Sequence, residues 1–228
     1  MQPHQVIAIV PAAGKGLRFS SSKSKLLEKV RGKPIIFHTI EKLLSMPEVG
    51  DVIIATRQED EESFKSILPE SERIAFVRGG STRSMSVRNA LEYIEKNLTI
   101  SKDEQLIAVH DAARCCISHG LMKRAIEAAR VYKAISVGMP LSDSLKEVDF
   151  DRKVLDSKLR ERYWTVQTPQ VFIFSILLQA HKQGVEECTD DAGLVEALHP
   201  VYMVEGEKSN IKITTQEDLK LAEFILAK

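Results

Sequence analysis

Residues 6–18 read VIAIVPAAGKGLR and hold the two features that predict the fold. The first five residues are apolar and mostly β-branched without polar alternation, a pattern typical of a strand buried on both faces of a sheet. The small residues that follow let backbone N–H groups approach an anion closely, and the basic residues add positive charge. A buried strand followed by such a turn predicts a phosphate-binding loop at the carboxyl end of a parallel strand.

Apolar runs of the same kind recur along the chain and alternate with helical patterns. Further strands are expected at residues 52–55, 74–77, 106–109 and 134–137. Helices are expected after Pro34, over residues 87–98, behind Ser118 as N-cap, and after Thr215 with Asp218 at near capping-box spacing. This order predicts an α/β fold with right-handed crossovers, in which helices flank a mostly parallel sheet and ligands bind at the carboxyl ends of its strands.

One segment breaks the alternation. Residues 141–162 are polar and rich in charge, and they read as two short extended pieces, 144–148 and 153–155, around the turn Asp149-Phe150-Asp151. We expect a protruding β-hairpin arm here. No Pro/Gly/Ser-rich linker, internal repeat or low-complexity tract divides the chain, so residues 1–228 are expected to form a single domain with this arm as an excursion.

The composition argues against several classes of function. Thirty-two basic residues balance thirty-two acidic ones, so no overall positive field favours nucleic acid as a partner. The three cysteines lack CxxC or Cys/His spacing, which argues against a disulfide framework and a zinc site and fits a reducing cytoplasm. The N-terminal apolar run is about half as long as a membrane-spanning helix, so we expect neither a signal peptide nor a membrane anchor.

Five further segments, in order along the chain, narrow the interpretation of the loop. They are GGSTRSMSV at residues 79–87, VHDAAR at 109–114, TPQ at 168–170, TDDA at 189–192 and NIKIT at 210–214. With the loop, these segments make the chain resemble the 2-C-methyl-D-erythritol 4-phosphate cytidylyltransferase family almost from end to end. Any one of them would be a weak signal, whereas the ordered series is specific.

The resemblance implies a Rossmann-like nucleotidyltransferase fold and a CTP-dependent enzyme. The reaction implied is transfer of CMP from CTP to 2-C-methyl-D-erythritol 4-phosphate with release of pyrophosphate, in the non-mevalonate isoprenoid precursor pathway. A phosphate oxygen of the acceptor attacks the α-phosphorus of CTP, so positioning and charge stabilisation supply most of the catalysis. Mg²⁺ is the expected cofactor, with Asp111 as its candidate ligand.

The resemblance also assigns roles to individual residues. Arg18 and Lys25 would stabilise the pentavalent transition state and the leaving group. Lys212 would orient the attacking phosphate, and Arg160, a further catalytic residue, would bind the phosphate end of the acceptor. The nucleotide would contact Pro11, Ala12, Ala13, Gly14, Gly16, Gly80, Arg83, Ser86, Asp111 and Ala112. The polyol phosphate would contact Arg114, Asp143, Ser144 and Thr168.

In members of the family the arm reaches across a two-fold axis. The resemblance therefore implies a homodimer in which Arg160 and Ser144 serve the neighbouring subunit's site.

Each motif also has a plain structural explanation. The glycine-rich loop alone would be a tight strand-to-helix turn, and residues 111–114 alone would be a cap or a surface ion pair. Ser86 would bond to its own helix backbone, and residues 189–191 would cap a helix. Arg160 would belong to a solvated run of charges.

Two other functions remain open. A ribitol 5-phosphate cytidylyltransferase would share the loop, Mg²⁺ and CTP and would differ in the polyol pocket. A non-catalytic CTP-binding or regulatory module is suggested by Ser24 and Cys115, which stand where the family usually has proline. Retention of Arg18, Lys25 and Lys212 favours an enzyme.

Overall fold

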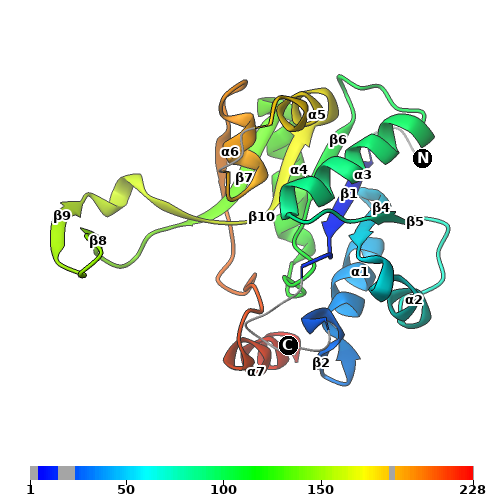
Figure 1. The fold of residues 1–228 in the computed structure, drawn as a ribbon, viewed down its shortest axis with the longest axis horizontal. Helices are drawn as coiled ribbons and strands as arrows, with labels where there is room; N and C mark the ends of the chain where they lie inside the picture. The colour runs from blue at the N-terminus through cyan, green and yellow to red at the C-terminus, as the bar shows by residue number, and fades with distance from the viewer. Residues whose placement is uncertain (1–4, 15–23, 185–187, 228) are drawn as a thin grey trace.

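The structure of the protein, a computed structural model, describes residues 5–14, 24–184 and 188–227 (Figure 1). Its main strands are β1 (Val6–Pro11), β4 (Val49–Thr56), β5 (Ile74–Arg78), β6 (Leu106–Val109), β7 (Ala134–Pro140), β10 (Trp164–Ile173) and β11 (Tyr202–Glu205). They form a seven-stranded sheet in the order β11-β7-β10-β6-β1-β4-β5. Strand β10 runs antiparallel to β6 and β7, and the other neighbours are parallel. The mostly parallel sheet is therefore confirmed.

Helices cover both faces of this sheet. They are α1 (Ile35–Ser45), α2 (Gln58–Ile67), α3 (Arg83–Asn97), α4 (His119–Tyr132), α5 (Phe174–Gln183), α6 (Asp191–Val195) and α7 (Gln216–Ile225). One hydrophobic core joins α1, α4 and α7 to the sheet, and a second joins α3, α5 and α6 to its other face. In the described part of the chain, no helix is both long and apolar enough to cross a membrane.

Strand β1 explains why its apolar run has no polar alternation. Val6, Ala8 and Val10 pack into the first core, whereas Ile7 and Ile9 pack into the second. Because a strand directs successive side chains to opposite faces, a strand between two cores must be apolar at every position. The interior position of β1, between β4 and β6, places the residues directly after the strand, 12–14, at the carboxyl edge of the sheet.

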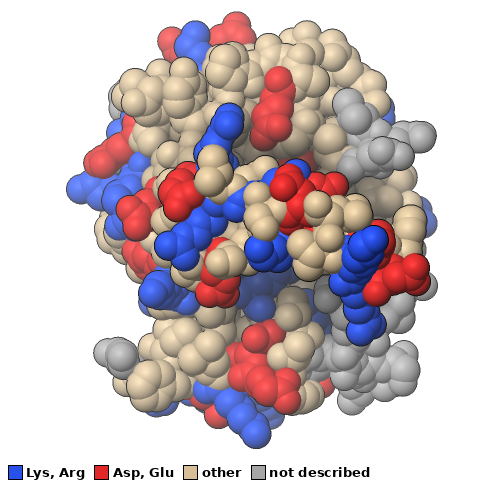
Figure 2. Space-filling view, turned by 90° about the vertical axis from the view of Figure 1, so that its left-hand side faces the viewer, with Lys and Arg blue, Asp and Glu red and all other residues tan. Residues whose placement is uncertain are grey.

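The arm is present as predicted. It consists of β8 (Leu145–Val148), β9 (Val154–Lys158) and the short helix η2 (Arg160–Arg162), and it extends away from the sheet between β7 and β10 (Figure 1). At its tip, Asp149 Oδ1 accepts hydrogen bonds from the backbone N–H groups of Asp151 and Lys153 at 3.0 and 2.9 Å. Seen from the arm's side, Lys and Arg side chains are mixed with Asp and Glu rather than gathered on one area (Figure 2).

A short connection leads from the phosphate-loop region into α1. It contains η1 (Lys25–Leu27) and a small hairpin of β2 (Lys29–Val30) and β3 (Lys33–Pro34). Ser24 is buried, and its side chain accepts a hydrogen bond from the backbone N–H of Leu26. The serine therefore caps η1 and fixes the start of the segment that carries Lys25.

Candidate functional site

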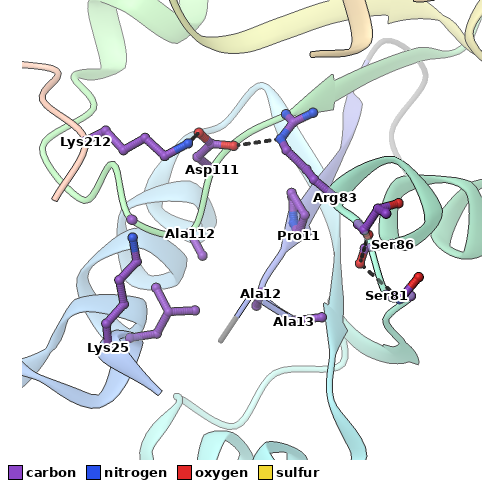
Figure 3. Close-up of a pocket in the computed structure, with 15 residues that line it drawn as sticks. Pro11, Ala12, Ala13, Lys25, Ser81, Arg83, Ser86, Asp111, Ala112 and Lys212 are labelled. Carbon is purple, nitrogen blue, oxygen red and sulfur yellow. Dashed lines mark hydrogen bonds and ion pairs between the residues drawn. The ribbon is translucent and has the colours of Figure 1, made fainter. Parts of the chain in front are cut away.

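A cavity of about 190 Å³ lies where β1, β5 and β6 end, at the carboxyl edge predicted from the strand order. Of the residues expected at the nucleotide or in catalysis, it is lined by Pro11, Ala12, Ala13, Gly14, Lys25, Gly80, Arg83, Ser86, Asp111, Ala112 and Lys212. Figure 3 shows Lys25 and Lys212 on one side of the cavity, with Arg83 and Ser86 opposite. Arg18 and Gly16 lie outside the described residues.

The floor of the cavity is formed by backbone held close to the sheet. The N–H of Ala12 donates to the carbonyl oxygen of Ala55 at 2.8 Å, and the N–H of Gly79 donates to that of Thr56 at 2.7 Å. A Cβ added at Gly79 would collide with the Cβ of Ala13. The turn after β5 and the loop after β1 can approach this closely only because residue 79 has no side chain.

The first turn of α3 forms one wall. Ser86 is buried, and its hydroxyl donates to the carbonyl oxygen of Thr82 and accepts from the N–H of Gly80, both at 3.0 Å. Thr82 caps the helix by accepting from the N–H of Met85 at 3.1 Å. The structural explanation of Ser86 is thus correct, and the same residue lines the cavity. The N-terminal end of α3 also favours anions here.

A row of alternating charges crosses the cavity (Figure 3). Lys212 Nζ lies 2.7 Å from Asp111 Oδ2, and Arg83 Nε donates to Asp111 Oδ1 at 3.1 Å. Burial alone would raise the pKa of Asp111, but the charges of Arg83 and Lys212 outweigh burial and lower that pKa. The Asp111 carboxylate is therefore ionised, and each of its oxygens faces a cation.

A second cavity of about 210 Å³ lies beyond this row. It is lined by Arg114, Val166, Gln167, Thr168, Gln170, Thr189 and Asp190, together with Arg83, Asp111 and Lys212. The last three residues line both cavities. Among the described residues, Arg83 Nη2 and Arg114 Nε are buried without a hydrogen-bond partner, and Arg114 Nε lies 3.9 Å from Asp111 Oδ2.

Thr168 and His110 position the segment that carries Asp111. Thr168 Oγ1 accepts from the N–H of Asp111 at 3.0 Å and lies 3.1 Å from His110 Nδ1. His110 Nε2 lies 3.1 Å from the carbonyl oxygen of Arg114. Burial lowers the pKa of His110 to about 4, so its ring is neutral at pH 7. Nε2–H then donates to Arg114, and Nδ1 accepts from the Thr168 hydroxyl.

The remaining predicted site residues lie either at the first cavity or on the arm. Lys25 Nζ donates to the carbonyl oxygen of Ile213 at 2.9 Å, which ties η1 to the segment that carries Lys212. Arg160, Asp143 and Ser144 are exposed on the arm and line neither of these two cavities. Arg160 Nη1 donates to the carbonyl oxygen of Ser142 at 2.6 Å.

Sequence reasoning missed the group behind Arg83. Asp191 and His181 are buried, and Asp191 bonds to both Arg83 and His181. For residues 189–191 the sequence predicts a helix cap or a role near the metal or the polyol hydroxyls, and Asp190 does cap α6 through the N–H of Gly193 at 3.0 Å. No local pattern marks His181, because its partners lie in other elements.

Asp111 is chemically suited to Mg²⁺. The ion takes oxygen ligands, keeps several waters, and is usually held by one or two carboxylates plus the phosphates of a substrate. Within residues 5–14, 24–184 and 188–227 there is no cluster of three or more His, Cys, Asp or Glu residues that could hold a metal without such help. The single carboxylate of Asp111 in the lining of the first cavity fits that mode of binding.

Comparisons with known proteins found matches over almost the whole chain. The family described as "IspD: 2-C-methyl-D-erythritol 4-phosphate cytidylyltransferase" matches residues 6–228. A 2-C-methyl-D-erythritol 4-phosphate cytidylyltransferase from Caldanaerobacter subterraneus subsp. tengcongensis is 36% identical over 231 residues, covering 98% of this chain and 99% of the relative. The crystal structure of 4-diphosphocytidyl-2C-methyl-D-erythritol synthase from Anaerococcus prevotii has a TM-score of 0.83 at 30% identity, covering 98% and 96% of the two chains. That of the cytidylyltransferase from Thermus thermophilus has a TM-score of 0.78 at 32% identity, covering 98% and 100%.

Proposed function

The chain belongs to the 2-C-methyl-D-erythritol 4-phosphate cytidylyltransferase family, and from this membership we propose how its residues divide the reaction. The enzyme transfers CMP from CTP to 2-C-methyl-D-erythritol 4-phosphate in the non-mevalonate isoprenoid precursor pathway. A phosphate oxygen of the acceptor bonds to the α-phosphorus of CTP, and the bond from that phosphorus to pyrophosphate breaks. The products are 4-diphosphocytidyl-2-C-methyl-D-erythritol and pyrophosphate.

We assign CTP to the cavity after β1. Ala12, Gly80 and Ser86 are compact. The N–H of Ala12 is held by Ala55, and Gly80 and Ser86 are joined by a hydrogen bond, so these residues suit the edge of a pyrimidine. A pocket bounded by closely packed backbone excludes a purine by volume. The phosphates would lie toward Gly14 and Lys25, which contribute backbone N–H groups and a positive charge to the lining of the cavity.

We assign the polyol phosphate to the second cavity. Arg114 and Thr168 line that cavity, and Lys212 stands at its boundary with the first one. The observation that carries this assignment is the row of Arg83, Asp111 and Lys212, because it borders both cavities and so marks where two substrates would meet. Lys212 would hold the attacking phosphate in line with the α-phosphorus, which converts an encounter of two anions into an oriented reaction.

Charge stabilisation completes the proposed mechanism. Lys25, and Arg18 by resemblance, would stabilise negative charge on the pentavalent phosphorus and on the leaving pyrophosphate. Bound Mg²⁺ would neutralise part of the triphosphate charge, with Asp111 as its protein ligand. Lys212 and Arg83 would keep Asp111 ionised and oriented for that task.

We also propose that the enzyme is a homodimer joined through the arm. The arm exposes Val148, Phe150, Val154, Leu155 and Leu159, and Phe150 at the tip is fully exposed. Apolar side chains gathered on a protruding hairpin are typical of a surface that a partner covers. A second copy would place Arg160 and Ser144 at the neighbouring subunit's acceptor cavity.

The organisation of the chain as one domain and its location in the cytoplasm are parts of the same proposal. The two cores lie on opposite faces of one sheet, which supports a single domain over residues 1–228. Cys115, Cys116 and Cys188 are free thiols, which suits a reducing compartment.

The function is tested by pyrophosphate release from CTP and Mg²⁺, measured side by side with 2-C-methyl-D-erythritol 4-phosphate and ribitol 5-phosphate. We expect a clear preference for the former, and we expect Lys212→Ala to lower kcat by about a hundredfold or more because the acceptor phosphate loses its orienting charge. Preference for ribitol 5-phosphate would reassign the substrate. Binding of CTP without pyrophosphate release from either acceptor would favour a non-catalytic module.

A further inference from the structure

A buried group behind Arg83 has no part in the mechanism described so far. Asp191 Oδ2 accepts a hydrogen bond from Arg83 Nη1 at 2.6 Å, and Asp191 Oδ1 lies 3.0 Å from His181 Nε2. The side chains of Asp191 and His181 are each only 1% exposed. Neither residue lines the two cavities, so a substrate bound there would not touch them.

The position of Asp191 is fixed by the elements around it. It is the first residue of α6, and its N–H donates to Gln170 Oε1 on β10 at 3.1 Å. Gln170 Nε2 in turn donates to Ser136 Oγ on β7 and to Asp190 Oδ2, both at 2.8 Å. The backbone of Asp191 is thus bonded to β10, which fixes the start of α6 against the sheet.

Arg83 connects Asp191 to Asp111, which lines the cavities. Its guanidinium contacts two carboxylates through different nitrogens, Nε to Asp111 and Nη1 to Asp191. A planar fork held at two points cannot rotate, whereas a group bonded to Asp111 alone could swing about that contact. With Arg83 fixed on Asp111 Oδ1, Oδ2 stays directed at Lys212 Nζ, 2.7 Å away.

We propose that Asp191, braced by His181, is a positioning residue that holds Asp111 and Lys212 in the geometry needed for phosphate attack, and that it acts through Arg83. This inference rests on the cytidylyltransferase function proposed above. A purely structural role explains the arrangement less well, because a buried ion pair adds little net stability compared with apolar residues of the same volume. The pair joins the start of α6 to Asp111, which among the described residues is the carboxylate that lines both cavities.

The test compares three variants in turnover and in nucleotide binding. Asp191→Asn keeps the side-chain shape and removes its charge, and Arg83→Lys keeps a positive charge that cannot bridge two carboxylates. We expect each to lower kcat about tenfold or more, because a small misplacement of reacting groups costs that much in rate. His181→Gln leaves the ion pair intact, and we expect a smaller loss of about threefold. In Asp191→Asn and His181→Gln, which change no residue that lines the CTP cavity, the CTP dissociation constant, measured by calorimetry, should change less than about threefold.

The double variant Arg83→Lys/Asp191→Asn separates a shared role from two independent ones. If Asp191 acts through Arg83, the double variant is no slower than the slower single variant. The matched control is Asp60→Asn, which breaks another Arg–Asp contact of 2.6 Å, that with Arg57, and lines neither cavity. It should leave kcat unchanged while lowering the melting temperature.

Two results would overturn the inference. One is wild-type kcat in folded Asp191→Asn, and the other is losses in the two single variants that multiply in the double variant. If Asp191→Asn does not fold, His181→Gln is the deciding variant. Unchanged kcat in His181→Gln would show that the contact between His181 and Asp191 does not contribute to the reaction. An inactive wild-type protein would count against the proposed function instead.

Discussion

His110 lies in the segment that carries Asp111, and its ring is fully buried between Thr168 and Arg114. Burial favours the neutral ring, whose two nitrogens each have a partner of the right kind. The neutral ring of His110 therefore supports the segment that carries Asp111. Its presence links the stability of the fold to pH, because the same ring in the unfolded chain can take up a proton.

We predict that the protein loses stability as pH falls from 7 to 5. The pKa of His110 falls from 6.5 to about 4 on folding, so its contribution is complete above pH 6.5 and is lost as pH falls toward 4. The loss between pH 7 and pH 5 should be about 2 kcal/mol at 1.4 kcal/mol per pKa unit. Urea unfolding at the two pH values measures it. His110→Gln should be less stable than the wild type, but its free energy of unfolding should depend less on pH. An equal change between pH 7 and pH 5 in the two proteins would refute the assignment of the effect to His110.

Cys115, which stands where the family usually has proline, and its neighbour Cys116 take no part in the chemistry of the site. Both are buried, their Sγ atoms lie 4.0 Å apart, and neither lines the two cavities. The contact with Cys116 and burial raise the pKa of the Cys115 thiol, which keeps it protonated and unreactive. Cysteine in place of the family's usual proline therefore acts here as a small core residue.

At the scale of elements, the site depends on close approach between two loops. The loop after β1 meets the turn between β5 and α3, and the N-terminal turn of α3 forms the wall that carries Gly80 and Ser86. Gly79 sits at the contact, where a Cβ would collide with that of Ala13 and lie 3.2 Å from the carbonyl oxygen of Thr56. These atoms belong to backbone or to a rigid side chain and cannot move aside cheaply.

We predict that Gly79→Ala separates the two loops and weakens CTP binding about tenfold or more, with a loss of stability of about 1–3 kcal/mol typical of overpacking. Calorimetric titration with CTP and thermal unfolding measure the two effects. Gly120→Ala on α4 is the matched control, because the nearest atom to its Cβ would be the flexible end of Arg124 at 3.6 Å. Equal CTP affinity in the Gly79→Ala and wild-type proteins would show that this contact does not shape the cavity.

At the scale of the whole molecule, the strand order brings the two cavities together. Strand β10 inserts antiparallel between β6 and β7, so Thr168 and Gln170 lie beside the segment that follows β6. The arm leaves the body between β7 and β10 (Figure 1). Its exposed apolar side chains belong to neither core. Completion of the acceptor site by a neighbouring arm is therefore a property that only an assembly of two chains would have.

We predict that two inactive variants restore activity when their subunits are exchanged. If Arg160 acts across the dimer, a mixed dimer of Lys212→Ala and Arg160→Ala chains has one complete site, so a random mixture should regain about a quarter of the wild-type sites. Pyrophosphate release measures the recovery. Lys212→Ala mixed with a chain that carries both substitutions is the control and should stay inactive. No recovery, with dimers present by light scattering, would place Arg160 in its own subunit's site or in none.

The sequence by itself determined the local elements and the identity of most cavity residues. The apolar runs correspond to the five predicted strands, Ser118 caps α4, and Thr215 and Asp218 form the predicted capping box of α7. Such features depend on neighbours a few residues apart, so their periodicity and chemistry can be read along the chain. The loop motifs could likewise be placed at the ends of their strands, where the cavity lies.

Only the tertiary structure decided which side chains meet. The insertion of β10 and the edge strand β11 were not predicted, because residues 164–173 mix polar and apolar residues and β11 is short and largely exposed. Arg83 contacts Asp191 across 108 positions of the chain, and the sequence carries no local signal for that pair. The physical reason is that such contacts depend on strand order and on which helix covers which face of the sheet. Burial and the neighbouring charges then determine the protonation states of the groups that meet.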